Sequence, residues 1–540
     1  MNRVVVLGGY GVFGGRLCHN LCADWEVVVA GRSLALARAF CAGTSGIPAM
    51  LDRDDPGFGA ALAALRPFAV VDAAGPFQGY GDHGVARAAL AAGAHYLDLS
   101  DDAGFTSGIG GLDAMAKAVG LAALSGVSSV PALSSAVVQT LRAGIADIHL
   151  IDSAILPGNR APRGLSVIRA ILVQVGRPVI QWRGGRVDPQ PGWSGLRRIA
   201  DGPLKGRSAA IIGAPDLALF PEWFAARSVV FRAGLELPVM QAGLWLLGWL
   251  VRLRLVRSLT PLARPLQFAA NLLHRFGSDQ GGMTVTVAGT TEDGRAIRRD
   301  WVLLAKGGDG PQVPAIPARV MLIRLAAEQV APGARACLAE FPLADAVAAM
   351  DGLAITTQRC ESPFPLIFAE AMAADFARLP PALCDLHSVI DLRHFRGEAR
   401  IDRGRGLLAR IVARIMGFPP AAENVPVQVT MERRGDSERW TRDFGERRFH
   451  STLSLGPKGL RERFGALDFD IGLRLQDGAL HYPVTAGRLF GLLPMPRWLL
   501  PVSETIEAVD PHGRATFDVA LSHPLCGQII RYRGWLKPIP

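Results

Sequence analysis

The glycine-rich stretch near the N-terminus constrains the fold of this chain more than any other feature. An aliphatic run, Val4–Leu7, ends in glycines, and residues compatible with a helix follow. Gly9, Gly11 and Gly14 have the GxGxxG spacing. In that motif the first glycine makes a tight turn, the second lets the backbone approach a pyrophosphate, and the third lets helix and strand pack closely. The stretch predicts a dinucleotide site, and an ordinary strand–helix loop is the competing interpretation.

In the sequence after the loop, strand-like segments alternate with helical segments. Such alternation predicts a doubly wound parallel sheet of α/β class. Further strands are expected over Glu26–Gly31, Ile47–Leu51, Ala69–Ala74, His95–Leu99 and Gly120–Leu124, with helices over Gly57–Leu65, His83–Ala92 and Leu112–Val119. Ligands bind at the carboxyl ends of such strands.

Candidate cofactor-binding residues therefore lie in the first loop and just after the next strands. They are Gly8, Gly9, Tyr10, Gly11, Val12, Phe13, Gly14, Gly31, Arg32, Ser33, Asp52, Ala74, Gly75, Pro76, Phe77 and Ser100. An NAD site usually has Asp or Glu at the end of the second strand, where this chain has Gly31-Arg32-Ser33. The guanidinium of Arg32 suits a 2′-phosphate, so NADP is the predicted cofactor. The alternative is a solvent-exposed arginine at a strand end.

Two further segments carry a family resemblance. Residues 70–81 contain Ala-Gly-Pro-Phe-Gln-Gly-Tyr-Gly, and residues 91–100 contain Ala-Gly-Ala-His-Tyr-Leu-Asp. Together with the first loop, Gly31-Arg32-Ser33 and Gly307–Pro311, they resemble the saccharopine dehydrogenase-like family, from Met1 to about Thr357. The resemblance implies an NADP-dependent reductase or dehydrogenase, built as a Rossmann domain with an inserted α+β domain. The family strand often ends T/S-G-E, whereas this one ends Ser100-Asp101-Asp102.

Four regions are expected along the chain. Residues 1–130 form the Rossmann NADP-binding domain, 131–300 an α+β substrate or dimerisation domain, and 301–360 a strand and helices returning to the Rossmann domain. Residues 361–540 have strand-like runs between Gly, Asp and Pro turns, which predicts a mostly antiparallel β domain. That region resembles a domain of unknown function that follows saccharopine dehydrogenase-like halves in bacteria.

Three residues beside the predicted crevice could donate a proton when a carbonyl or imine is reduced. Tyr80 follows the fourth strand, His83 begins the next helix, and Asp102 ends the next strand. Each has a structural alternative: Tyr80 as a packing lid, His83 as a neighbour of a helix cap, and Asp102 as an N-cap. No cluster with metal-ligand spacing is found, so no metal is predicted.

The most apolar stretch, residues 237–259, includes Leu244–Val251 and is interrupted by Arg252, Arg254 and Arg257. A membrane-spanning helix needs about 20 largely uncharged residues. Two tryptophans and a basic end suit a segment lying in a membrane interface, which predicts peripheral membrane contact. A buried helix or a contact within a homodimer, the expected oligomer, is the alternative.

Composition narrows the class of partner and the compartment. The net charge is +10, but the arginines are scattered, so nucleic acid is not expected as a partner. Seven irregularly spaced cysteines and a start that leads directly into a strand favour a reducing cytoplasmic location, with contact at the membrane surface. The predicted function is an NADP-dependent oxidoreductase acting on a C=C, C=O or C=N bond of a hydrophobic, lipid-like small molecule. The alternative is a non-catalytic NADP-binding lipid carrier or membrane-surface scaffold.

Overall fold

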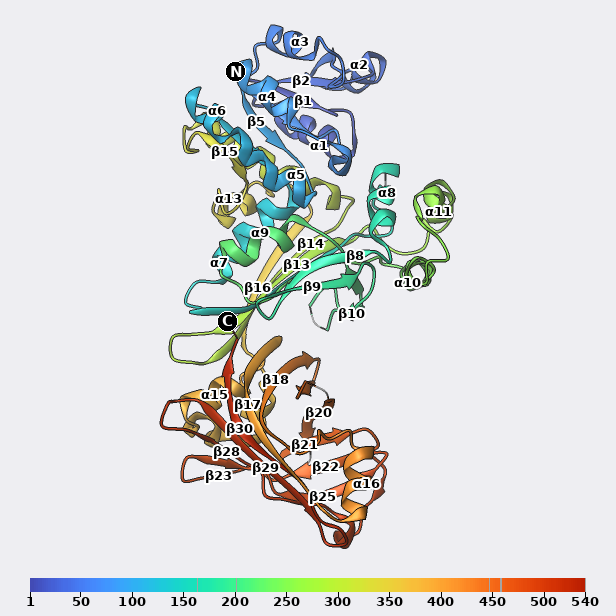
Figure 1. Ribbon diagram of the computed structural model, residues 1–540. Coiled ribbons are helices and arrows are strands. Elements are labelled where there is room, and N and C mark those ends of the chain that lie inside the picture. The colour runs from blue at the N-terminus through green and yellow to red at the C-terminus, as the bar shows by residue number, and fades with distance from the viewer. Residues whose placement is uncertain (163, 201, 446, 457–458, 540) are drawn as a thin grey trace. The chain divides into compact units, whose positions relative to one another are not determined.

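The computed structural model describes the chain from residue 1 to residue 539, apart from 163, 201, 446, 457 and 458 (Figure 1). The chain divides into two compact units. The first comprises Met1–Trp182, Val187–Val287 and Arg299–Glu361, and the second comprises Arg183–Arg186, Ala288–Arg298 and Ser362–Pro540.

The first unit begins with a parallel sheet, as the sequence predicts. Its strand order is β15-β6-β5-β4-β1-β2-β3, and all its pairings are parallel. The strands are β1 (Arg3–Leu7), β2 (Glu26–Gly31), β3 (Ile47–Met50), β4 (Ala69–Asp72), β5 (His95–Asp98), β6 (Ala122–Ser125) and β15 (Gly333–Ala336). The β1, β2 and β4 side chains are almost all buried, because helices cover both faces of such a sheet.

Helices follow most of these strands, as expected for a doubly wound sheet. They are α1 (Val12–Leu21), α2 (Leu34–Cys41), α3 (Phe58–Ala64), α4 (Gly84–Ala91), α5 (Ala103–Gly108), α6 (Asp113–Ala118) and α7 (Ser134–Leu141). The returning segment includes η5 (Gly310–Ala315), α12 (Ile316–Ala326), β15 and α13 (Leu343–Ala348). The strand expected near the start of residues 301–360 is the second half of β14 (Ala296–Ala305), which belongs to a second sheet, so β15 is the strand that joins the parallel sheet.

The second sheet of the first unit is mixed, and its main path is β10-β11-β12-β7-β13-β14-β16, with β8 and β9 beside β12. The strands are β7 (Asp147–Leu156), β8 (Pro178–Arg183), β9 (Arg186–Pro191), β10 (Arg197–Arg198), β11 (Ser208–Ile211), β12 (Val229–Ala233), β13 (Gly281–Thr290), β14 (Ala296–Ala305) and β16 (Ile355–Pro363). Helix α9 (Pro215–Trp223) packs against α5, at the carboxyl edge of the parallel sheet. Three helices lie to one side of this second sheet (Figure 1): α8 (Leu165–Gln174), α10 (Pro238–Arg252) and α11 (Ala263–Leu272).

The second unit is built on an antiparallel sheet, which confirms the predicted class. Its order is β23-β24-β28-β29-β30-β17-β18-β19-β20-β21-β22-β25-β26, with β27 beside β29. The long central strands are β17 (Leu392–Arg403), β18 (Ala422–Arg434), β19 (Ser437–Asp443), β20 (Arg448–Gly456), β29 (Ala515–His523) and β30 (Gly527–Pro538). The shorter ones are β21 (Gly459–Phe464), β22 (Leu467–Ile471), β23 (Arg474–Gln476), β24 (Ala479–His481), β25 (Val484–Leu489), β26 (Leu493–Pro494), β27 (Val502–Ser503) and β28 (Ile506–Val509).

This sheet curves until its two ends come close to each other. Only two residues separate β22 from β23, although these strands lie near opposite ends of the order. Two residues can span only about 10 Å between strand ends. The Gly472 N–H also donates to the Pro483 carbonyl, 3.1 Å away, beside the equally short β24–β25 connection. The sheet therefore wraps into a nearly closed barrel.

Two short helices contribute to the core enclosed by this sheet. They are α14 (Ile367–Met372), followed by η6 (Ala373–Arg378), and α15 (Pro381–His387). Helix α14 packs on β20 and β21, whereas α15 packs on β28 and β29. Phe368 and Leu383 are fully buried in one hydrophobic cluster with Met431 and Ile530 of the sheet. Of helix α16 (Leu407–Ile415), Ala413 belongs to this cluster and Val412 packs against it.

Candidate cofactor site

The glycine loop between β1 and α1 leaves no room for side chains. Gly8 has a φ of 71°, a conformation that L side chains rarely adopt. A Cβ on Gly14 would lie 2.4 Å from the Gly8 carbonyl oxygen, so helix and strand approach each other closely here. Gly11 is exposed and stands at the N-cap position of α1, where it has no side chain to cap the helix, so the α1 N-terminus is uncapped. The N–H groups of Val12, Phe13 and Gly14 in the first turn are therefore available to an anion.

Tyr10 connects this loop to the end of β2. Its hydroxyl accepts a hydrogen bond from the Ser33 N–H, 3.1 Å away. A Cβ on Gly31 would lie 2.5 Å from the same hydroxyl, so the Tyr10 ring occupies the space over Gly31. Gly31 is thus required by Tyr10, a reason that the sequence pattern alone does not reveal.

Arg32 and Ser33 lie at the junction of β2 and α2. The Ser33 hydroxyl accepts from the Leu36 N–H and caps α2, while the Arg32 side chain is exposed. Next to them the Leu51 N–H donates to the Gly31 carbonyl, which places Asp52 at the same edge of the sheet. Arg32 and the α2 N-terminus add positive charge to this edge, where Asp52 adds a carboxylate.

Arg53 was not singled out in the sequence, yet it organises the loop after β4. Its guanidinium lies 3.2 Å from Asp72 Oδ2 and 3.3 Å from the centre of the Tyr80 ring. Asp72 is fully buried, and burial raises its pKa, although Arg53 opposes this. The signal in the sequence was an arginine next to Asp52, in the loop after β3. The stacked guanidinium holds Tyr80 against the sheet.

Tyr80 and His83 both bind backbone carbonyls. The Tyr80 hydroxyl donates to the Ala74 carbonyl, and burial raises the pKa of Tyr80, so the hydroxyl is protonated at neutral pH. His83 Nε2 lies 2.8 Å from the Phe105 carbonyl oxygen, which makes this nitrogen the protonated one. The rings of Phe77, Tyr80 and Phe105 pack together. Ala74, Gly75 and Pro76 precede this cluster, and Gly75 and Pro76 are exposed at the sheet edge.

Asp98 joins the ends of β5 and β6. Its Oδ1 accepts from the Ser125 hydroxyl (2.9 Å) and from the N–H groups of Gly126 (2.8 Å) and Ser100 (3.0 Å). Burial raises its pKa to about 7, against the effect of these donors. Ser100 is buried and its hydroxyl accepts from the Asp102 N–H, so its side chain supports the loop. Asp102 accepts from the Phe105 N–H and is the N-cap of α5, the structural alternative considered above.

Asp216 is a buried carboxyl group that sequence analysis missed. It lies in the first turn of α9, which packs on α5 and on η3 (Ser129–Leu133), the segment after β6. Among the described residues, neither of its oxygens has a hydrogen-bond partner by geometry. Burial raises its pKa to about 7, opposed by the nearby Ser134 hydroxyl. No motif marks this residue, because it reaches the sheet edge from α9, between β11 and β12 of the second sheet.

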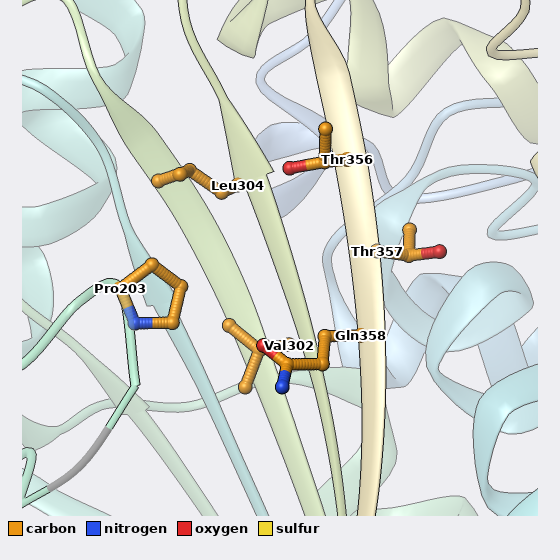
Figure 2. Close-up of a pocket in the computed structure, with 6 residues that line it drawn as sticks. All are labelled: Pro203, Val302, Leu304, Thr356, Thr357 and Gln358. Carbon is orange, nitrogen blue, oxygen red and sulfur yellow. The ribbon is translucent and has the colours of Figure 1, made fainter.

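Two cavities flank the β14–β16 end of the second sheet. One, of about 370 Å³, is lined by Val302 and Leu304 of β14, Thr356–Gln358 of β16, and Pro203 (Figure 2). In that view the Thr357 side chain points away from the others. The second, of about 1000 Å³, has a mixed lining that includes Trp301, Arg324, Glu340, Phe341 and Arg359. Neither lining includes the glycine loop or the ends of β2, β4 and β5, so they do not mark the cofactor edge.

Comparison with known proteins agrees with this division of the chain. Residues 379–536 match the family described as "Domain of unknown function (DUF4166)". Saccharopine dehydrogenase (L-Glu forming) from Saccharomyces cerevisiae is similar in structure, with a TM-score of 0.50 and 14% identity over 67% of this chain and 100% of that chain. Comparison with curated protein sequences finds no significant match.

Weaker structural likenesses involve other dehydrogenases and reductases. A probable dehydrogenase from Thermotoga maritima gives a TM-score of 0.33 with 10% identity, over 65% of this chain and 96% of that chain. KijD10, a 3-ketoreductase from Actinomadura kijaniata solved with NADP and TDP-benzene, gives 0.31 with 13% identity, over 64% and 95%. The saccharopine dehydrogenase likeness establishes the fold of the N-terminal two-thirds: a Rossmann-type sheet with an inserted mixed sheet.

Proposed function

We propose that the protein is an NADP-dependent oxidoreductase of saccharopine dehydrogenase type, acting on a C=C, C=O or C=N bond of a hydrophobic small molecule. The observation that carries the proposal is the glycine loop, with the uncapped α1 N-terminus and the exposed Arg32 on the same edge. A bound nicotinamide cofactor would supply or accept the hydride. The residues of this chain bind it, orient it and move the accompanying proton.

Arg32 supports NADP over NAD. No carboxylate stands at Gly31–Ser33, where an NAD site usually binds the ribose hydroxyls. A guanidinium forms charge-assisted hydrogen bonds with a phosphate dianion, and these are stronger than bonds between neutral groups. The α2 N-terminus, which begins after Ser33, adds its positive dipole end.

The residues we propose for proton transfer are Tyr80, His83 and Asp102, with Tyr80 first. Tyr80 holds its proton at neutral pH, and its hydroxyl already donates to an acceptor at the loop after β4. Transfer to a substrate would require the hydroxyl to turn from the Ala74 carbonyl. His83 and Asp102 hold the adjoining helix ends through Phe105, which suits them to positioning this loop.

Cofactor choice is tested by titrating the full-length protein with NADPH and with NADH. Arg32→Ala should weaken NADPH binding about 10- to 100-fold, because a charge-assisted hydrogen bond is worth roughly 1.5–3 kcal/mol. NADH binding should stay unchanged. Arg38→Ala, also exposed and on α2, is the matched control. Equal loss for both cofactors would contradict the assignment of Arg32 to the 2′-phosphate.

Catalysis is tested by NADPH oxidation with panels of enoyl, carbonyl and imine substrates of increasing apolar length. Tyr80→Phe should lower kcat about 100-fold or more with little change in NADPH affinity, in line with the usual contribution of general acids. Unchanged turnover would remove Tyr80 from the reaction. Cofactor binding without turnover on any panel would favour a non-catalytic NADP-binding carrier.

A further inference from the structure

Helices α10 and α11 expose most of their apolar side chains. Only Gln241 and Gly248 are buried among the 15 residues of α10, and only Ala263 among the 10 of α11. The exposed apolar side chains in and around the two helices are Val239, Trp245, Leu246, Trp249, Leu250, Leu253, Leu255, Leu262, Phe268, Leu272 and Phe276. Leu253 is 61% exposed and Phe268 is 73% exposed. We call this set the apolar helical face.

Close backbone contacts attach the apolar helical face to the rest of the first unit. A Cβ on Gly176, just after α8, would lie 2.5 Å from the Gly248 carbonyl oxygen. The Gln241 side chain accepts from the Leu235 N–H at 3.0 Å, and α11 packs on α8. Gly248, Val251 and Gln241 of α10 make these contacts, whereas its large side chains Trp245, Leu246, Trp249 and Leu250 remain exposed. The arrangement is a firmly held helix whose hydrophobic side faces away from the protein.

The charged side chains of the segment that carries α10 and α11 are all positive. Between Glu236 and Asp279 the sequence contains no Asp or Glu, whereas it contains Arg252, Arg254, Arg257, Arg264 and Arg275. The Arg252 guanidinium lies 4.1 Å from the Trp249 ring centre, and Trp249 packs edge-on against Trp245. Arg275 lies similarly over Phe276. Apolar and aromatic side chains are thus interleaved with cations.

We propose that the apolar helical face docks on the surface of an anionic lipid bilayer, with α10 and α11 lying in the interface. Exposed leucines and phenylalanines would enter the acyl boundary, tryptophans would lie at headgroup level, and arginines would reach lipid phosphates. Basic residues near an anionic leaflet each add attraction that salt weakens. Within the described part of the chain, no helix is long and apolar enough to cross a membrane, so α10 would lie in the interface rather than span it.

Charge argues against a second copy of the chain as the occupant. In a two-fold dimer the same patch meets itself, so a face that carries only arginines would oppose its own cations. An anionic bilayer instead supplies the complementary charge for the same apolar area. The two occupants can be told apart by experiment, because binding to a bilayer depends on the charge of the lipid phosphates whereas self-association does not.

The test is flotation of the full-length protein with two kinds of vesicle. One contains phosphatidylcholine alone, and in the other about one lipid in three is the anionic phosphatidylglycerol. Trp245→Ala/Trp249→Ala and Arg257→Glu/Arg264→Glu should each weaken binding to the anionic vesicles at least tenfold. Trp223→Ala, an exposed tryptophan on α9, and Arg87→Glu, an exposed arginine on α4, are the matched controls. NADPH affinity should stay unchanged in all four, which shows that the first unit is folded.

Fluorescence quenching shows whether Trp245 and Trp249 enter the bilayer. Brominated lipids should quench part of the wild-type fluorescence, and the Trp245→Ala/Trp249→Ala variant should lose most of this quenching. Wild-type flotation that is equal with and without phosphatidylglycerol, or variants that bind as well as the wild type, would overturn the proposal. Variants that turn a dimer into a monomer in analytical ultracentrifugation, with lipid binding intact, would assign the face to a second copy instead.

Discussion

The parallel sheet of the first unit and the antiparallel sheet of the second place their polar side chains differently. In the parallel sheet Asp72 and Asp98 are register partners, and both lie at the carboxyl edge beside Gly8 and Ser100. In the antiparallel sheet consecutive strand ends alternate between two edges, so no single edge collects functional groups. Its main polar cluster, formed by His387, Tyr482 and Glu507, lies inside the barrel instead.

This difference explains why one unit reveals a site and the other does not. Topology alone locates the ligand edge of a doubly wound sheet, so a glycine loop and one arginine suffice to indicate a cofactor. The barrel has no such rule. Its cluster joins the last residue of α15, the β24–β25 connection and β28, with His387 Nε2 and the Tyr482 hydroxyl both within 2.7 Å of Glu507 Oε2. These bonds are buried among Phe368 and Trp440, which indicates a role in holding the barrel together.

The largest expected effect is on the pH dependence of stability and comes from Asp216, a buried acid at the carboxyl edge of the parallel sheet. Its pKa of about 7 is raised above the value of 3.8 of a free aspartate. The folded state therefore holds a proton that the unfolded state releases, and stability falls as pH rises from about 4 to about 7. The loss is about 4 kcal/mol if the whole shift is expressed.

Asp216→Asn should lack this slope, so the melting temperature of the variant relative to the wild type should rise between pH 5 and pH 8. Asp98 titrates in the same range but is present in both proteins and cancels in the difference. Parallel pH profiles for the two proteins would show that Asp216 ionises normally.

A somewhat smaller effect is expected at Gly14. A methyl group would overlap the Gly8 carbonyl oxygen, so Gly14→Ala should reduce NADPH affinity at least 100-fold, or about 3 kcal/mol, and lower the stability of the first unit. Gly110→Ala is the control, because nothing lies within 4 Å of a Cβ there. Calorimetric NADPH titration of both variants checks this, and equal affinities would break the link between loop geometry and cofactor binding.

A change in the polar cluster of the barrel should have a smaller effect on stability, and this effect should be confined to the second unit. Glu507→Gln replaces the charged acceptor of His387 and Tyr482, which should cost about 2 kcal/mol of stability. NADPH binding should not change. Glu398→Gln, on the exposed side of β17, is the control. Denaturant unfolding measured beside NADPH titration checks both statements, and a loss of cofactor affinity would contradict the separation of the two units.

The sequence predicted β1 to β6, which alternate with helical patterns, and missed β15, which comes after the second sheet in the chain. β1, β2 and β4 stand out because burial on both faces requires Val and Ala throughout. β15, Gly-Ala-Arg-Ala, carries no such signal and was recognised only through its pairing with β6. Among the strand-like runs of residues 361–540, the run after Gly465 forms two strands, β22 and β23, which are separated at Gly472 and lie near opposite ends of the sheet order.

At the candidate site, residues that carry a sequence motif lie at the strand ends where the motif predicts them, whereas residues brought in by tertiary folding were not singled out. The glycine loop and Gly31–Ser33 lie where the motif places them, at the ends of β1 and β2. Arg53 and Asp216 have no motif, because one acts by stacking on Tyr80 and the other arrives from α9. The roles of Tyr80, His83 and Asp102 in catalysis stay predictions, since their contacts in the structure are to backbone groups.

Hydrogen–deuterium exchange of the full-length protein with and without NADPH shows where the cofactor binds. We predict slower exchange in the first turn of α1, at Gly31–Ser33 and in the loop after β4, because bound phosphate and ribose shield these N–H groups. Exchange within residues 379–536 should not change. Protection confined to the barrel, or none in the glycine loop at saturating NADPH, would contradict binding at the carboxyl edge of the parallel sheet.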